Sequence, residues 1–226
     1  MIELYRFIFK NKLNSSHSVS LIKKIFGTIG GYFKVLLFYL IIVTILTSIG
    51  VNNSKKPFLN QPKVPEIYKL LMVVLIMPIV EEIVFRLSLI PQKRKLYISL
   101  GFGNIFCFFF FKRHFENEVT HKIFFLFISS LSLYLLYKFY DKIIIFINQN
   151  TRLFIHLLTI IFCLIHIPNY KFENGNGIGP YLTLFLMLLN GYYFSLVRLK
   201  YGFYYAVFIH VFHNLLVSIP MLIKYF

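Results

Sequence analysis

The 226 residues are 58% hydrophobic and only 14% charged, and 24 Lys and Arg stand against 8 Asp and Glu, a net charge of +16. A soluble domain of this length would have too little polar surface to cover so many apolar side chains. Nucleic-acid binding is not expected either, because the cations come with no recognition motif. The composition predicts an all-α polytopic membrane protein, a transmembrane helical bundle of about seven spans, within a range of six to eight.

In chain order, residues 1–26 mix basic and apolar side chains and predict a basic interfacial N-terminal segment. Residues 27–226 are expected to form the transmembrane domain. Apolar runs predict spans at about 27–50, 67–90, 96–111, 123–140 with an apolar tail to 147, 153–167, 181–197 and 204–223. The third and fifth runs are short, so that either could be partly re-entrant.

Basic residues gather between the apolar runs, as in Lys93-Arg94-Lys95, which is typical of cytoplasmic loops in bacterial membrane proteins. With seven spans, the N-terminal cations, this cluster and the pair Arg198 and Lys200 fall on one side of the membrane. This predicts a cytoplasmic N-terminus in the inner membrane of a bacterial cell. The loop that carries Lys55, Lys56 and Lys63 favours the opposite orientation.

Three charged residues, Glu81, Glu82 and Arg86, lie inside the second predicted span. Ionisable groups at this depth are costly, at about 2.5–3.5 kcal/mol each, and indicate a functional site by default. Glu82 and Arg86 are spaced i, i+4 and are expected to pair. Glu81 lies about 100° around the helix from Glu82, which leaves its carboxylate available as a general base. An ion-pair network that only locks helices together explains the same residues equally well.

Histidines and an asparagine occupy later spans. His166, near the end of the fifth, is by itself more typical of a core residue than of a catalytic one. His210 and Asn214 share one face of the seventh span, where they suit either oxyanion stabilisation or an interhelical hydrogen bond. His213, beside them, is expected to support the site, and His156, near a span start, to lie at the interface.

A glutamate, two histidines and an asparagine facing a common interior could hydrolyse an amide, bind a metal or relay protons. The chain has no His-Glu-x-x-His zinc motif and no Ser or Cys nucleophile at a recognisable elbow. The residue types therefore leave these three chemistries open.

The order and spacing of these residues resemble a known family. The three motifs are Glu81-Glu82-x-x-x-Arg86, Phe162-x-x-x-His166 and His210-x-x-x-Asn214, each in an apolar run. They resemble those of the CPBP family, the CAAX-protease and bacteriocin-processing (Abi) intramembrane glutamic endopeptidases. Arg198 and Gly202 look like the Arg-and-Gly turn that precedes the family's last motif. The resemblance covers about residues 78–218, and the gap between the first two motifs is long enough for two additional helices.

The resemblance implies a role for each matched residue. Glu81 and His166 would activate a water molecule for attack on the scissile carbonyl. His210 and Asn214 would stabilise the oxyanion. The catalytic core would span about residues 67–223. The family is thought to use no metal or other cofactor, so none is expected here.

Glu82 and Arg86 would support this site, in agreement with the helix geometry that separates them from Glu81. The resemblance implies an endopeptidase whose partners are the lipid bilayer and a peptide or protein substrate in or at the membrane. Two alternatives stay open. One is a non-catalytic immunity or scaffold member of the family, and the other is a proton-coupled transporter, for which internal repeats would be expected and none is found.

Overall fold

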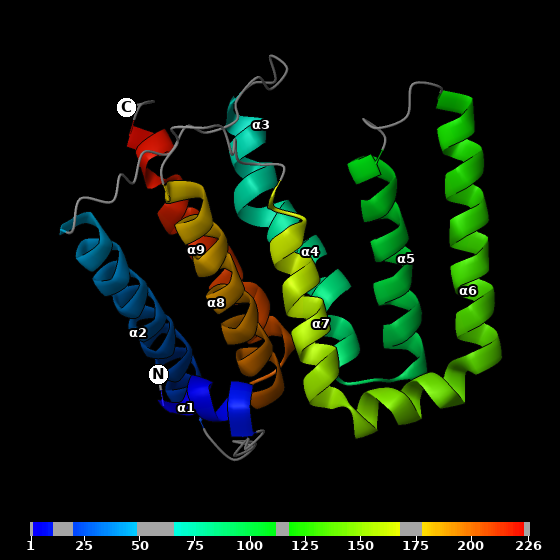
Figure 1. The fold of residues 1–226 in the computed structure, drawn as a ribbon, viewed down its shortest axis with the longest axis horizontal. Helices are drawn as coiled ribbons and strands as arrows, with labels where there is room; N and C mark the ends of the chain where they lie inside the picture. Colours follow the sequence, from blue (N-terminus) through cyan, green and yellow to red (C-terminus); the bar gives the residue numbers. More distant parts are fainter. Residues whose placement is uncertain (1, 11–19, 49–65, 112–117, 168–177, 224–226) are drawn as a thin grey trace.

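The structure is a computed structural model that describes residues 2–10, 20–48, 66–111, 118–167 and 178–223 (Figure 1). Its α-helices are α1 (Ile2–Tyr5), α2 (Leu21–Ser48), α3 (Glu66–Leu71), α4 (Met77–Arg86), α5 (Lys93–Phe111), α6 (Glu118–Gln149), α7 (Thr151–Leu164), α8 (Gly179–Lys200) and α9 (Phe203–Ile223). Shorter turns are the π-helical η1 (Arg6–Lys10) and η2 (Met72–Ile76) and the 3-10 turn η3 (Leu87–Leu89). The prediction of an all-α bundle is confirmed.

Each predicted span coincides with one helical rod. The second span is the continuous run of α3, η2, α4 and η3, and the long gap between the first two motifs is filled by α5 and α6. Hydrocarbon offers no partners to the backbone, so apolar runs of this length form helices that satisfy their own hydrogen bonds. The Lys55, Lys56 and Lys63 loop lies outside the described residues.

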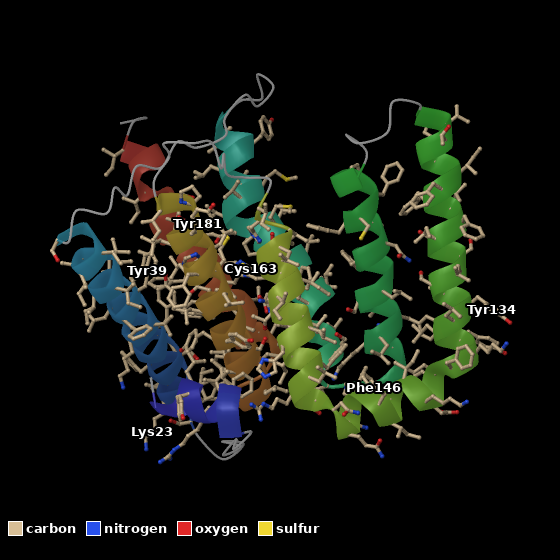
Figure 2. The ribbon with its side chains drawn as sticks, viewed as in Figure 1. Lys23, Tyr39, Tyr134, Phe146, Cys163 and Tyr181 are labelled. Atoms are coloured by element: carbon tan, nitrogen blue, oxygen red, sulfur yellow. The ribbon has the colours of Figure 1, made fainter. Side chains whose placement is uncertain are left out.

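Three helical stretches in the described part of the chain are long and apolar enough to cross a membrane: Leu21–Leu46, Lys122–Gln149 and Gly179–Lys200. Thr151–Leu164 and Phe203–Ile219 are shorter apolar helices. Large apolar side chains cover the outer faces of α2 and α6, and Figure 2 shows Tyr134 of α6 pointing outward. Lipid covers such surfaces in an integral membrane protein, which is the class that the composition predicts.

The N-terminal segment packs against the bundle. Leu4 and Phe7 are buried in the same apolar cluster as Phe194 and Val197 of α8. Helix α2 begins at Leu21, somewhat before the predicted start of the first span. Residues 11–19 lie outside the described ranges, and an interfacial position for the segment remains a prediction.

Helices α4, α7 and α9 pack together around α8 (Figure 1). Helix α2 packs against α8 and α9, and the α5–α6 pair lies outside α4. The turn from α8 to α9 requires Gly202, whose φ of +112° is in the region that favours glycine. Its N–H approaches the carbonyls of Val197 and Arg198, which ends α8. This turn directs α9 back along α4 and so places the third motif beside the first.

Candidate active site

The centre of the site is the imidazole of His210, which lies between the two glutamates of α4. Its Nδ1 is 2.9 Å from Glu82 Oε1 and its Nε2 is 3.5 Å from Glu81 Oε2. All three residues are buried, with Glu82 fully inaccessible. A neutral imidazole donates from one nitrogen only, so His210 donates to both carboxylates only when it is protonated.

His166 approaches Glu81 from the other side. Its Nε2 lies 4.0 Å from Glu81 Oε1, and its Nδ1 lies 2.7 Å from the backbone oxygen of Phe162. Because a carbonyl oxygen only accepts, Nδ1–H is the donor there, and in the neutral ring Nε2 presents a lone pair towards Glu81. Glu81 thus has a histidine at each of its two oxygens, one from α9 and one just after the end of α7.

Glu82 and Arg86 form the predicted i, i+4 pair, with 3.4 Å between Arg86 Nη1 and Glu82 Oε1. The guanidinium lies over the ring of Phe162, with Arg86 Cζ 4.1 Å from its centroid. Such cation–π contacts gain strength in a desolvated environment. The backbone oxygen of Arg86 accepts a hydrogen bond from Arg198 Nε at 3.1 Å, which ties α4 to the end of α8. The motif phenylalanine and Arg198 therefore both hold Arg86 in place.

Asn214 is on the same helix as His210, but its side chain is engaged elsewhere. Its Nδ2 donates to the backbone oxygen of Val73 at 2.8 Å, in the π-helical turn that precedes α4. This contact joins α9 to η2 rather than to the carboxylates. The oxyanion role expected for Asn214 remains a prediction.

Phe194 of α8 is a site residue that sequence reasoning did not single out. Its ring is stacked on His210, with centroids 4.5 Å apart and an interplanar angle of 25°. The ring of Phe162 meets the same imidazole edge-on at 5.9 Å. These two rings fix the plane in which His210 faces both glutamates. The chain contains 28 Phe, so no local signal distinguishes this one.

His213, expected to support the site, makes its hydrogen bonds away from the carboxylates. Its Nδ1 is 2.7 Å from Tyr32 Oη of α2, and its Nε2 accepts from Asn190 Nδ2 of α8 at 3.3 Å. It therefore joins α9 to two neighbouring helices. His156 is hydrogen-bonded to Tyr192 Oη at 2.7 Å.

Metal binding was one of the chemistries that the residue types allowed. Within the described ranges, no group of three or more His, Cys, Asp or Glu side chains has an arrangement that could hold a metal ion. Cys107 on α5 and Cys163 on α7 are both free thiols. The described side chains thus offer carboxylates, imidazoles and an amide for chemistry.

Fold and site together define a helical membrane protein with a buried cluster of carboxylates and imidazoles at the meeting point of α4, α7 and α9. Residues 63–216 match the Rce1-like family, whose description is type II CAAX prenyl endopeptidase. The chain belongs to this family, and the resemblance to CAAX proteases is confirmed. The matched region includes every residue of the three motifs. Comparisons with curated proteins and with solved structures found no match.

Because α8 packs closely against the site, adding a side chain at Gly191 is expected to destabilise the protein. A Cβ there would lie 2.8 Å from Thr159 Cγ2, 3.3 Å from Phe162 Cδ1 and 3.5 Å from Arg86 Nη2. Gly191→Ala is therefore expected to lower the free energy of unfolding by about 1–3 kcal/mol, the usual cost of overpacking. Thermal unfolding in detergent measures this loss of stability.

Gly101→Ala is the matched control, because a Cβ there meets nothing within 4 Å, and the substitution should be neutral or stabilising. Equal melting temperatures for the two variants would contradict the packing argument.

Proposed function

We propose that this protein is an intramembrane endopeptidase that hydrolyses a peptide bond through a water molecule activated by Glu81, without a metal. The observation that carries the proposal is the difference in contacts between the two glutamates. Glu82 is engaged by Arg86 and by His210 Nδ1, whereas Glu81 contacts only the Nε2 atoms of His166 and His210 among its described polar neighbours. A carboxylate that contacts histidines but no arginine is suited to accept a proton.

The proposed reaction begins with a water molecule held between Glu81 and His166. Their 4.0 Å separation is beyond a direct hydrogen bond and is compatible with a bridging water. Glu81 takes one proton while the water oxygen bonds to the carbonyl carbon of the substrate. The C=O π electrons move onto the oxygen to form an oxyanion. Return of the proton from Glu81 to the amide nitrogen then releases the new amine as the C–N bond breaks.

Stabilisation of the oxyanion falls to His210 and Asn214 in this scheme. A protonated His210 would donate to an oxyanion near Glu81, since its Nε2 already faces that carboxylate at 3.5 Å. Asn214 would first have to exchange its hydrogen bond to the Val73 carbonyl for one to the substrate. Glu82, Arg86 and Phe194 act on His210 and not on the substrate, by fixing its orientation.

The proposed substrate is a peptide or protein segment that reaches the site from the membrane or its surface, and the proposed location is the cytoplasmic membrane of a bacterial cell. The family name supports an endopeptidase acting on membrane-associated chains. The basic clusters between the helices support an orientation with the N-terminus in the cytoplasm, as in bacterial membrane proteins.

Comparative peptidomics of membranes tests this function. Cells that express the wild-type chain are expected to accumulate cleaved membrane-associated peptides that are absent when Glu81→Ala is expressed at the same level. Chelator treatment of the purified wild-type protein should leave cleavage of such a peptide unchanged. Identical peptide profiles would support the non-catalytic immunity or scaffold alternative, and loss of cleavage with the chelator would favour a metal enzyme.

A further inference from the structure

The second half of α6 runs in a different direction from the first. At Phe139 the backbone leaves helical geometry, with φ −112° and ψ +18°. Figure 1 shows the following residues running across the end of the bundle at which α5 and α7 begin. Ile147 is buried in a cluster with Leu96 and Leu136, against which Tyr140, Ile143 and Ile144 pack. From Tyr140 to Ile147 the spacing of these residues is i, i+3, i+4 and i+7, that of an amphipathic helix held by one apolar stripe.

The opposite face of this segment combines basic and apolar side chains. Lys138 and Lys142 are exposed, and their Nζ atoms lie 5.4 and 5.8 Å from the ring centroid of Phe139. Ile145 is 53% exposed and Phe146 46% exposed, and Figure 2 shows Phe146 at the same end of the molecule. Residues 139–149 are far too few to span a bilayer, and cations beside exposed apolar residues are typical of helices in the headgroup layer.

Lysine and arginine residues of several other helices also lie at the end of the bundle where α5 and α7 begin. The parts of the chain at this end are α1, η1, the starts of α2, α5 and α7, and the end of α8 (Figure 1). The cations of these parts that are not buried include Arg6, Lys23, Lys24, Lys93, Arg94, Lys95, Arg152 and Lys200. Within these described segments and the second half of α6, the acidic residues are Glu3 and Asp141. A surface with this charge and with exposed apolar side chains is complementary to a negatively charged membrane surface.

We propose that this end of the bundle binds the anionic headgroups of one leaflet, with the Phe139–Gln149 segment of α6 lying flat in the headgroup layer. The apolar outer residues Ile145 and Phe146 enter the boundary of the acyl chains. Lys138 and Lys142, which are both close to the Phe139 ring, then lie at the level of the phosphates. The segment thereby sets the depth at which α5 and α7 enter the membrane.

Tryptophan fluorescence measures this depth, because the chain contains no Trp and each introduced Trp can be excited selectively over the 16 Tyr. Phe146→Trp and Phe127→Trp are compared in the full-length protein in vesicles of phosphatidylcholine and phosphatidylglycerol. Phe127 lies about 18 Å along α6 from Phe139, at 1.5 Å per residue. We expect Trp at 146 to be quenched best by bromines near the headgroups, and Trp at 127 by bromines near the chain ends.

Lipid charge is tested with bromine placed on one lipid class at a time. At equal mole fraction, brominated phosphatidylglycerol is expected to quench Trp at 146 about twofold more than brominated phosphatidylcholine does. Lys138→Glu with Lys142→Glu should abolish this preference. Lys122→Glu, the same change at the other end of α6, should leave it intact.

Three results would overturn the proposal: equal quenching by the two lipids, quenching of Trp at 146 at the bilayer centre, or protection of Trp at 146 from all brominated lipids. The last result would indicate that a protein, such as a second copy of the chain, covers this face. None of these measurements requires peptidase activity, so their outcome is independent of the proposed function.

Discussion

Replacing Glu81 with glutamine is expected to lower the rate of peptide cleavage about 10²- to 10⁴-fold while the protein remains folded, as loss of a general base typically does. Glutamine keeps the size of the side chain but cannot accept a proton. The described contacts of Glu81 are to His166 and His210, whereas the ion pair of Arg86 is with Glu82. Turnover of a fluorogenic membrane peptide measures the cleavage rate, and the melting temperature of the same preparation measures whether the protein remains folded.

Glu82→Gln is the matched control, with the same chemical change one residue along α4. Its carboxylate is fully buried and contacts both Arg86 and His210, so this variant is expected to lose melting temperature as well as activity. The contrast separates a catalytic carboxylate from a supporting one. Wild-type turnover in Glu81→Gln would rule out the proposed mechanism, and equal losses of stability in both variants would refute the division of labour between them.

Much of the fold was predictable from the sequence because a bilayer leaves a polypeptide few choices. An apolar run in hydrocarbon must form a helix, and so the seven predicted runs coincide with seven helical rods. The bend at Phe139 was not predictable, since it depends on the contacts that Tyr140 and Ile147 make with other helices. The π-helical turn at Met72–Ile76 contains no proline or glycine itself, and Pro78 just after it is a signal that the sequence prediction did not use.

In the site, the sequence predicts contacts between side chains of one helix but not contacts between different helices. The i, i+4 spacing of Glu82 and Arg86 is local, and the structure contains that pair. The position of His210 between both glutamates depends on how α9 crosses α4, and the stacking of Phe194 depends on α8. Spacing alone also put Asn214 beside His210, without indicating that its amide bonds to the backbone of the turn before α4.

Removal of the Arg86 charge is expected to have the largest effect on stability. The side chain is 1% exposed, and within the described part of the chain neither Nη1 nor Nη2 makes a hydrogen bond of good geometry. Its charge is compensated by Glu82 at 3.4 Å and by the aromatic rings around it. Arg86→Met leaves Glu82 buried without its cation, and breaking a buried pair in this way costs about 3–5 kcal/mol. Unfolding in mixed micelles with increasing SDS measures the loss.

A double-mutant cycle distinguishes loss of the ion pair from loss of packing volume. Glu82→Gln with Arg86→Met removes both charges, and a neutral amide and a thioether are far less costly to bury than an unpaired carboxylate. The double variant is therefore expected to be more stable than the sum of the single losses predicts, by about 1–3 kcal/mol of coupling. Activity should not return, because His210 still lacks the carboxylate that receives its Nδ1–H. Strictly additive losses would mean that Arg86 stabilises the bundle through its contact with Phe162 and not through Glu82.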